Sequence, residues 1–433
     1  MTDPLSYVRA VHFAATMVAA GTVFFLVFIA GPAFAAASDI PSAAAERFRR
    51  RSSWLVWTSL ALAVPSAAAW LGLLASDIYG APIDEVLRNG GVWTVATATR
   101  FGQVALARLG LSILLALSLA LSGSVAPRLR QRFVPPLLAA GLLVSPAWTG
   151  HAGAAPGLAG QFHLVADVLH LLAVGAWVGA LPALAMLLAG ARCREEPNRA
   201  GVTATAVHRF SSFGMVSVVA LLASGTVNTW YEVGSIDNLI ETAYGRLVLL
   251  KLGLFAAMIG IAAVNRFHLT PRLAAAGTVR RLCRNCLLET GLGFAAVLLV
   301  GFLGTMAPAS HAHLHPVYGA LPTDAAFVHI HTEAGMADVT IMPGHTGPAR
   351  ATIRLWNADF GPLDAQEVTL TLTAPSTGSK PTTRIAAQNS DGAWQVDRIE
   401  LSQPGDWTVI VDARLGPAKR LVLDAPIAIE PAQ

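Results

Sequence analysis

Three ionisable side chains follow one another on a long apolar segment near residues 162–188. His163, Asp167 and His170 are four and three residues apart, so an α-helix places all three on one face. A carboxylate one turn from an imidazole can orient the ring as a metal ligand or prepare it for proton transfer. A charged group near the centre of a membrane costs at least about 2.5–3.5 kcal/mol, which favours a functional role. The alternative is a set of interhelical hydrogen bonds and ion pairs that only hold helices together.

Further polar side chains interrupt other apolar segments. They lie in the halves of these segments that the distribution of arginines between the loops predicts to be periplasmic. They are Arg9, His12, Arg100, Arg108, His151 and Lys251. The candidate metal ligands are therefore His12, His151, His163 and His170, and the candidate supporting groups are Asp167, Lys251 and Arg108. The opposite halves show no comparable set of ligands, since His208 and His268 lie beside arginines and are expected at the membrane surface.

A second group of histidines follows the last apolar segment. It comprises His311, His313 and His315 directly after Met306, and then His329 and His331 on the first predicted strand. Alternate residues of an extended chain face the same way, so each His-x-His pair offers two imidazoles to one ion. The thioethers of Met306, Met336 and Met342 add a soft partner that favours Cu(I). A solvated linker without a metal is the alternative.

The elements that must position these groups are mostly membrane-spanning helices. The chain of 433 residues is 54% hydrophobic and only 13% charged, well below the roughly 25% charge of soluble domains. About eight apolar segments are long enough to cross roughly 30 Å of hydrocarbon, near residues 7–31, 54–76, 100–122, 133–150, 162–188, 211–231, 246–264 and 286–307. The first exceeds the roughly 7–15 apolar residues of a signal peptide, so we expect a retained helix.

Arginines alternate between the predicted loops and set the orientation. They cluster in the first, third, fifth and seventh loops, including Arg47 to Arg51, Arg128 to Arg132, Arg192 to Arg209 and Arg266 to Arg284. Because positive loops stay in the cytoplasm, both termini are predicted to be periplasmic. The same loops are expected to hold Cys193, Cys283 and Cys286. Cys283 and Cys286 form a CxxC pair. One such pair near the start of a helix is weak evidence for a metal or redox site, and ordinary interfacial cysteines are the other interpretation.

The tail after Met306 changes to short segments of alternating polarity. Val368, Leu370 and Leu372 share one face of residues 367–373, the pattern of a half-buried strand. Similar runs near 326–332, 337–342, 349–356, 393–401, 407–414 and 419–429 are separated by turn residues and favour an antiparallel β-sandwich. The fold class predicted is an all-α membrane bundle followed by a small all-β soluble domain, divided as bundle 1–308, linker 309–323 and β domain 324–433.

Several short motifs follow one another along the predicted bundle: Thr149-Gly150-His151-Ala152, Asp167-Val168-Leu169-His170 followed by Trp177-Val178-Gly179, Tyr244 to Lys251, Asn265-Arg266, and Thr270-Pro271-Arg272-Leu273. In their order and placement they resemble the copper resistance protein D (CopD) family of bacterial inner-membrane proteins. The tail, with Val328 to Thr332, Ala337 to Ile341 and Asp359 to Leu363, resembles the periplasmic YtkA-like domains fused to such proteins.

The resemblance implies a copper ion, Cu(I) or Cu(II), that is bound at the periplasmic side and imported across the inner membrane for copper homeostasis and resistance. Expected partners are the lipid bilayer, the copper ion and a periplasmic copper chaperone; no nucleic-acid module is visible. No enzyme activity is expected, and the chain has no ATP-binding motif of the GxxxxGK[ST] type, which disfavours a primary pump. Two alternatives stay open: a haem-binding membrane oxidoreductase or assembly factor, and a copper sensor or chaperone that transports nothing.

Overall fold

The computed structural model describes residues 4–37, 42–121, 128–150, 157–192, 197–306, 308–310, 324–332, 335–357, 363–375, 381–416 and 419–432. The chain divides into two compact units, Met1–His313 and Leu314–Gln433. Four predicted ligands, His151, His311, His313 and His315, lie outside the described residues, as does the side chain of His331. Each unit is described separately below.

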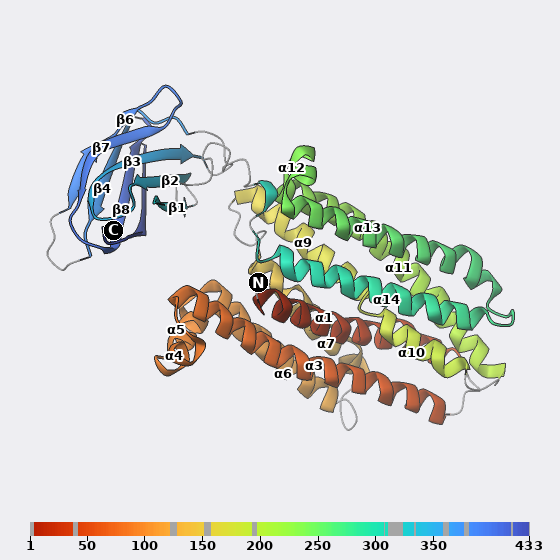
Figure 1. Ribbon diagram of the computed structural model, residues 1–433. Coiled ribbons are helices and arrows are strands. Elements are labelled where there is room, and N and C mark those ends of the chain that lie inside the picture. The colour runs from red at the N-terminus through yellow and green to blue at the C-terminus, as the bar shows by residue number, and fades with distance from the viewer. Residues whose placement is uncertain are drawn as a thin grey trace. The chain divides into compact units, whose positions relative to one another are not determined.

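The first unit is a bundle of long helices that run alongside one another (Figure 1). Its first half contains α1 (Pro4–Phe24), a π-helical turn (Phe25–Ala30), α2 (Gly31–Ala35), α3 (Ser42–Tyr79), α4 (Ile83–Arg88), α5 (Gly91–Ala98), α6 (Arg100–Ala120), α7 (Arg128–Val144) and a 3₁₀ turn (Ser145–Trp148). Its second half contains α9 (Gly157–Trp177), α10 (Leu181–Arg192), α11 (Pro197–Val233), α12 (Ile236–Glu241), α13 (Ala243–Val264), a π-helical turn (Asn265–Leu269), a 3₁₀ turn (Thr270–Arg272) and α14 (Thr278–Leu303).

Length and composition confirm a membrane bundle. Within the described ranges, seven helical segments are long and apolar enough to cross a membrane: Pro4–Ala35, Ala45–Tyr79, Arg100–Ala120, Gly157–Ala191, Gly201–Val233, Ala243–Arg272 and Thr278–Leu303. The remaining predicted span corresponds to a shorter apolar helix, Phe133–Trp148. All eight predicted segments are therefore helical, and one of them is short.

The helices extend further than the apolar runs, and this corrects the placement of several residues. Arg47 to Arg51 lie on α3 and Arg209 lies on α11, not in loops. Cys283 and Cys286 were also placed in a loop, but both lie on α14, where they are only 2% and 1% exposed. The prediction is wrong because arginines mark the membrane surface and not the end of a helix. A helix that begins at the membrane surface can carry arginines on one face and bury thiols on the other.

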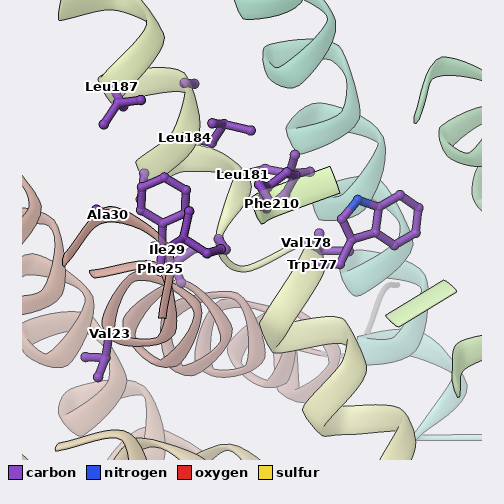
Figure 2. Close-up of a cluster of buried hydrophobic side chains, with 14 of the residues drawn as sticks. Val23, Phe25, Ile29, Ala30, Trp177, Val178, Leu181, Leu184, Leu187 and Phe210 are labelled. Atoms are coloured by element: carbon purple, nitrogen blue, oxygen red, sulfur yellow. The ribbon is translucent and has the colours of Figure 1, made fainter. Parts of the chain in front are cut away.

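One glycine contact fixes how α1 crosses the helix formed by α9 and α10. That helix is interrupted at residues 178–180, where Gly179 N donates to Val174 O. A Cβ atom on Gly179 would lie 2.2 Å from Met17 O, and one on Gly21 would lie 2.1 Å from the carbonyl carbon of Gly179. Only glycine permits this approach, which is typical of small-residue packing between membrane helices. The apolar core of the bundle includes residues next to these glycines, such as Ala20, Val178 and Ala180. Figure 2 shows part of this core, including Val178.

The second unit is an antiparallel β-sandwich, as predicted. One sheet has the order β1 (Ala326–Thr332), β2 (Gly335–Met342), β3 (Gly347–Trp356), β7 (Trp394–Leu401) and β6 (Ala387–Gln388). The other has the order β5 (Thr382–Ile385), β4 (Glu367–Thr373), β8 (Gly405–Arg414) and β9 (Arg420–Ile429). Inward side chains of both sheets, such as Val339 and Val411, form one core. The short strands β5 and β6 were missed because they are largely exposed and lack the apolar alternation.

Candidate functional site

The three ionisable residues of α9, His163, Asp167 and His170, all contact α11. The His163 ring stacks on Tyr231 with ring centroids 4.6 Å apart and planes 7° apart. Asn228 Nδ2 donates to Asp167 Oδ1 at 3.3 Å, and the His170 Nδ1 and Ser224 Oγ atoms are 3.1 Å apart. Partners on α11 thus descend as the α9 numbers rise, which is the register of antiparallel helices. The four-and-three spacing therefore places one polar row, which we call the α9 row, between these two helices.

Charged groups of α11 and α13 surround the α9 row. Glu232 and Lys251 both act electrostatically on Asp167, and Lys251 also acts on His170. Glu232 accepts a 2.8 Å hydrogen bond from the Tyr244 hydroxyl. Two carboxyl groups and one ammonium group leave the row with a negative balance when all are ionised. Such a balance favours a bound cation.

Met306 lies at the same end of the bundle as the start of the α9 row. It packs against an apolar cluster of Val233, Tyr244, Val248, Leu303 and Ala309. Tyr244 therefore links the thioether cluster to Glu232 through its hydroxyl group.

His12 belongs to a separate group, formed by α1, α3 and α6. Its Nδ1 lies 3.1 Å from the Ala63 carbonyl oxygen, so this nitrogen carries the proton and donates. The ring is only 2% exposed, and Nε2 has no hydrogen-bond partner among the residues that the structure describes. Trp70 meets the ring edge-on with centroids 5.7 Å apart. His12 thus presents a buried lone pair, but away from the α9 row.

Two arginines give the His12 group a positive balance. The guanidinium carbons of Arg9 and Arg108 lie 5.0 and 5.1 Å from the centroid of the Trp70 ring. Arg9 donates to the Gly304 carbonyl, while Arg108 donates to Ser145 Oγ at 2.8 Å and Thr149 Oγ1 at 3.0 Å. No carboxylate in the described part of the chain forms an ion pair with Arg108. This positive surrounding disfavours a bare cation at His12 and favours an anionic group.

The β domain orients one predicted ligand. His329 Nδ1 lies 2.5 Å from Asp338 Oδ1, and Trp356 Nε1 donates to Asp338 Oδ2 at 3.0 Å. Asp338 is only 3% exposed, so these bonds fix a buried carboxylate. A carboxylate that accepts from one ring nitrogen leaves the lone pair on the other, which is how many metal-binding histidines are held. His331 pairs with the fully buried Met336 in the neighbouring strand.

A buried carboxylate in the bundle was missed from the sequence. Glu289 on α14 is 2% exposed and accepts a 2.7 Å hydrogen bond from Asn265 Nδ2, while Asn265 Oδ1 accepts one of 2.7 Å from Asn285 Nδ2. The signal was present, because Glu289 interrupts the apolar segment predicted at 286–307. Among the described residues, no group of three or more His, Cys, Asp or Glu side chains is arranged to hold a metal ion. The metal-ligand assignments therefore stay predictions.

Fold and polar groups define a multi-pass helical membrane protein with an appended β-sandwich and buried histidines. The copper resistance protein D family matches residues 204–303, and the copper resistance protein D-like N-terminal domain matches residues 1–161. The chain is 31% identical to "Copper resistance protein D" of Pseudomonas syringae pv. tomato over 263 residues, 57% of this chain and 84% of the relative. It belongs to the copper resistance protein D family.

Two further relatives extend the comparison. "Copper transport protein CutJ" of Bacillus subtilis (strain 168) is 26% identical over 94% of this chain and 71% of its own length. "Inner membrane protein YebZ" of Escherichia coli (strain K12) is 28% identical over 69% of this chain and 97% of its own length. No solved structure matches the chain.

Proposed function

We propose that this protein binds copper at the periplasmic side of a bacterial inner membrane and imports it across the bundle, without enzymatic activity. The family supports copper handling, and the names of the relatives supply copper transport and the inner membrane. Arginine-rich helix ends support periplasmic termini. On this topology the α9 row, Met306 and the β domain all face the compartment from which copper arrives.

The α9 row is the observation that carries the proposal. It joins two imidazoles to a carboxyl group on the face of α9 that contacts α11, and Asp167 and Glu232 together outnumber the one nearby cation, Lys251. A cation that leaves water must exchange its hydration shell for such ligands to avoid a large desolvation cost. Imidazoles provide that exchange for copper, and Asp167 provides the compensating charge.

Copper flux into vesicles tests the proposal. Reconstituted wild-type protein should accumulate copper on an internal chelating probe, and His170→Ala should abolish the uptake. His268→Ala is the matched control, because His268 lies in the π-helical turn Asn265–Leu269, away from the α9 row. Unchanged uptake in His170→Ala would refute the site. Copper binding without uptake in wild type would instead support a sensor or chaperone.

The His12 group supports haem binding as a second candidate function. An unpartnered buried Nε2 beside two arginines suits a haem iron with its carboxylate side chains better than it suits a bare cation. An absorption spectrum of protein purified from haem-replete cells decides the matter. A Soret band that His12→Ala removes would support haem, and a colourless protein would exclude it.

A further inference from the structure

The CxxC pair and the missed carboxylate lie on one buried stripe of α14. Its successive buried residues are Leu282, Cys283, Cys286, Glu289 and Gly293. A Cβ atom on Gly293 would meet the Val178 side chain at 2.3 Å, and Cys283 Sγ lies 3.8 Å from Ala185 O. The stripe therefore faces the interrupted helix α9–α10, in the interior of the bundle.

This stripe is remote from both polar groups described above. Gly301, near the other end of α14, approaches Ser6 O of α1, and Gly304 accepts from Arg9. Cys283 lies close to the first turn of α14, about five turns away along the helix axis. On the proposed topology it lies in the cytoplasmic half, where the sequence showed no set of histidines comparable to that of the outer half.

Glu289 is a buried acid with no cation paired to it among the described residues. In the described ranges it forms no ion pair with Lys, Arg or His, and its bonded neighbour is the amide of Asn265. Asn265 begins a π-helical turn, a local distortion that is frequent at functional sites. A carboxyl group in this setting requires a proton or a cation to balance its charge.

Two free thiols lie next to that carboxyl group. Both cysteines are unpaired, and the groups that act electrostatically on Cys286 are Glu289 and Cys283. Residues three apart on a helix have Cβ atoms about 5–6 Å apart, which brings two sulfurs within reach of one ion. Thiolate sulfur is a soft ligand that suits soft ions such as Cu(I).

We propose that Cys283 and Cys286, with Glu289 one turn away as a supporting group, form a two-sulfur binding site for Cu(I) at the end of the bundle opposite Arg9. The sulfurs of Cys283 and Cys286 coordinate the ion, whose oxidation state does not change. Binding replaces the S–H bond of Cys286 by a Cu–S bond and releases that proton to the solvent, so that the cation and the thiolate carry no net charge. The inference rests on the proposed function for the identity of the ion and adds the inner site that inward transport requires.

Anaerobic Cu(I) titration of the purified full chain against a chromogenic Cu(I) chelator tests this site. The Cys283→Ala/Cys286→Ala variant should bind one Cu(I) fewer per chain and lose sulfur scattering in the copper X-ray absorption spectrum. Glu289→Gln should lower the affinity of this site for Cu(I) by roughly 10- to 100-fold, the usual effect of removing a group that supports a ligand. Cys193→Ala should bind as wild type does. Equal stoichiometry and equal sulfur scattering in all variants would overturn the site.

A measurement on wild type guards against variants that fail to fold. Cu(I) should protect Cys283 and Cys286, but not Cys193, from alkylation in partly unfolding detergent, as read by peptide mass. Absence of protection would also overturn the site. Vesicle uptake separates the two proposals: uptake without thiol protection refutes only the inner site, and thiol protection without uptake refutes only transport.

Discussion

At the scale of single residues, the structure adds orientation to residue types that the sequence already named. His329 was a candidate from its HxH pattern, but the partner that fixes its ring, Asp338, comes from the neighbouring strand. Such a pairing depends on strand register, which the alternation within one strand does not specify. The same holds for His163 and Tyr231, whose stacking depends on how two helices meet.

Asp338→Asn should separate orientation from mere presence of His329. The side-chain amide has one acceptor oxygen for two donors, His329 and Trp356. We therefore expect the free energy of unfolding to fall by about 1–3 kcal/mol. Copper affinity at His329 should fall by roughly 10- to 100-fold. Thermal unfolding and copper titration of the full chain measure the two effects.

Asp397→Asn is the matched control for that substitution. Asp397 also accepts a hydrogen bond from a neighbouring side chain, that of Arg350, but the Asp397 side chain is 58% exposed. An exposed ion pair contributes about 0–1 kcal/mol, so stability and copper affinity should change little. Equal losses in both variants would show that Asp338 has no orienting role.

At the scale of elements, the thickness of the hydrocarbon layer makes the membrane helices predictable from the sequence. The points at which those helices are interrupted could not be predicted in this way. The segment 157–191 has enough apolar residues for one span, yet it breaks at 178–180 to let α1 approach. The apolar pattern of this segment does not indicate the break, because the break depends on the close approach of another helix at Met17 and Gly21. The cysteines of α14 were misplaced for a related reason: nearby arginines marked the membrane surface, not the end of the helix.

Gly179→Ala should destabilise the bundle at this break. The added methyl group would overlap Met17 O, which is backbone and has little room to shift, so a loss of about 1–3 kcal/mol is expected. Gly190→Ala on α10 is the control, because a Cβ atom there has no neighbour within 4 Å. The midpoint of thermal unfolding in detergent should fall for Gly179→Ala alone. A normal midpoint would show that the helices separate without cost.

At the scale of the whole molecule, the alternating arginines predict an even number of crossings with both ends outside. The structure supplies the helices for this topology, including the short segment Phe133–Trp148. The short segment matters, because seven crossings would put the two termini on opposite sides of the membrane.

Reporter fusions distinguish the two topologies. Alkaline phosphatase fused after Gln433 should be active, and green fluorescent protein fused at the same position should not fluoresce. Both results are expected because both termini are predicted to be periplasmic. Fusions after Arg132, in a predicted cytoplasmic segment, should give the opposite result. A fluorescent C-terminal fusion would mean that Phe133–Trp148 does not cross, and the orientation of the tail would have to be reversed.

The close approach of Gly21 and Gly179 also bears on how the protein is made. These residues lie about 160 positions apart, which corresponds to roughly 8–30 s of synthesis at typical rates of about 5–20 residues per second. During this time α1 has left the ribosome and its small-residue face has no α9–α10 partner. The contacts of Arg9 with Gly304 and of Ser6 with Thr305 form later still, because they need the end of α14. We therefore expect α1 to be the last helix to reach its final neighbours. Until the bundle is complete, its small-residue face must be covered by lipid or by another membrane protein.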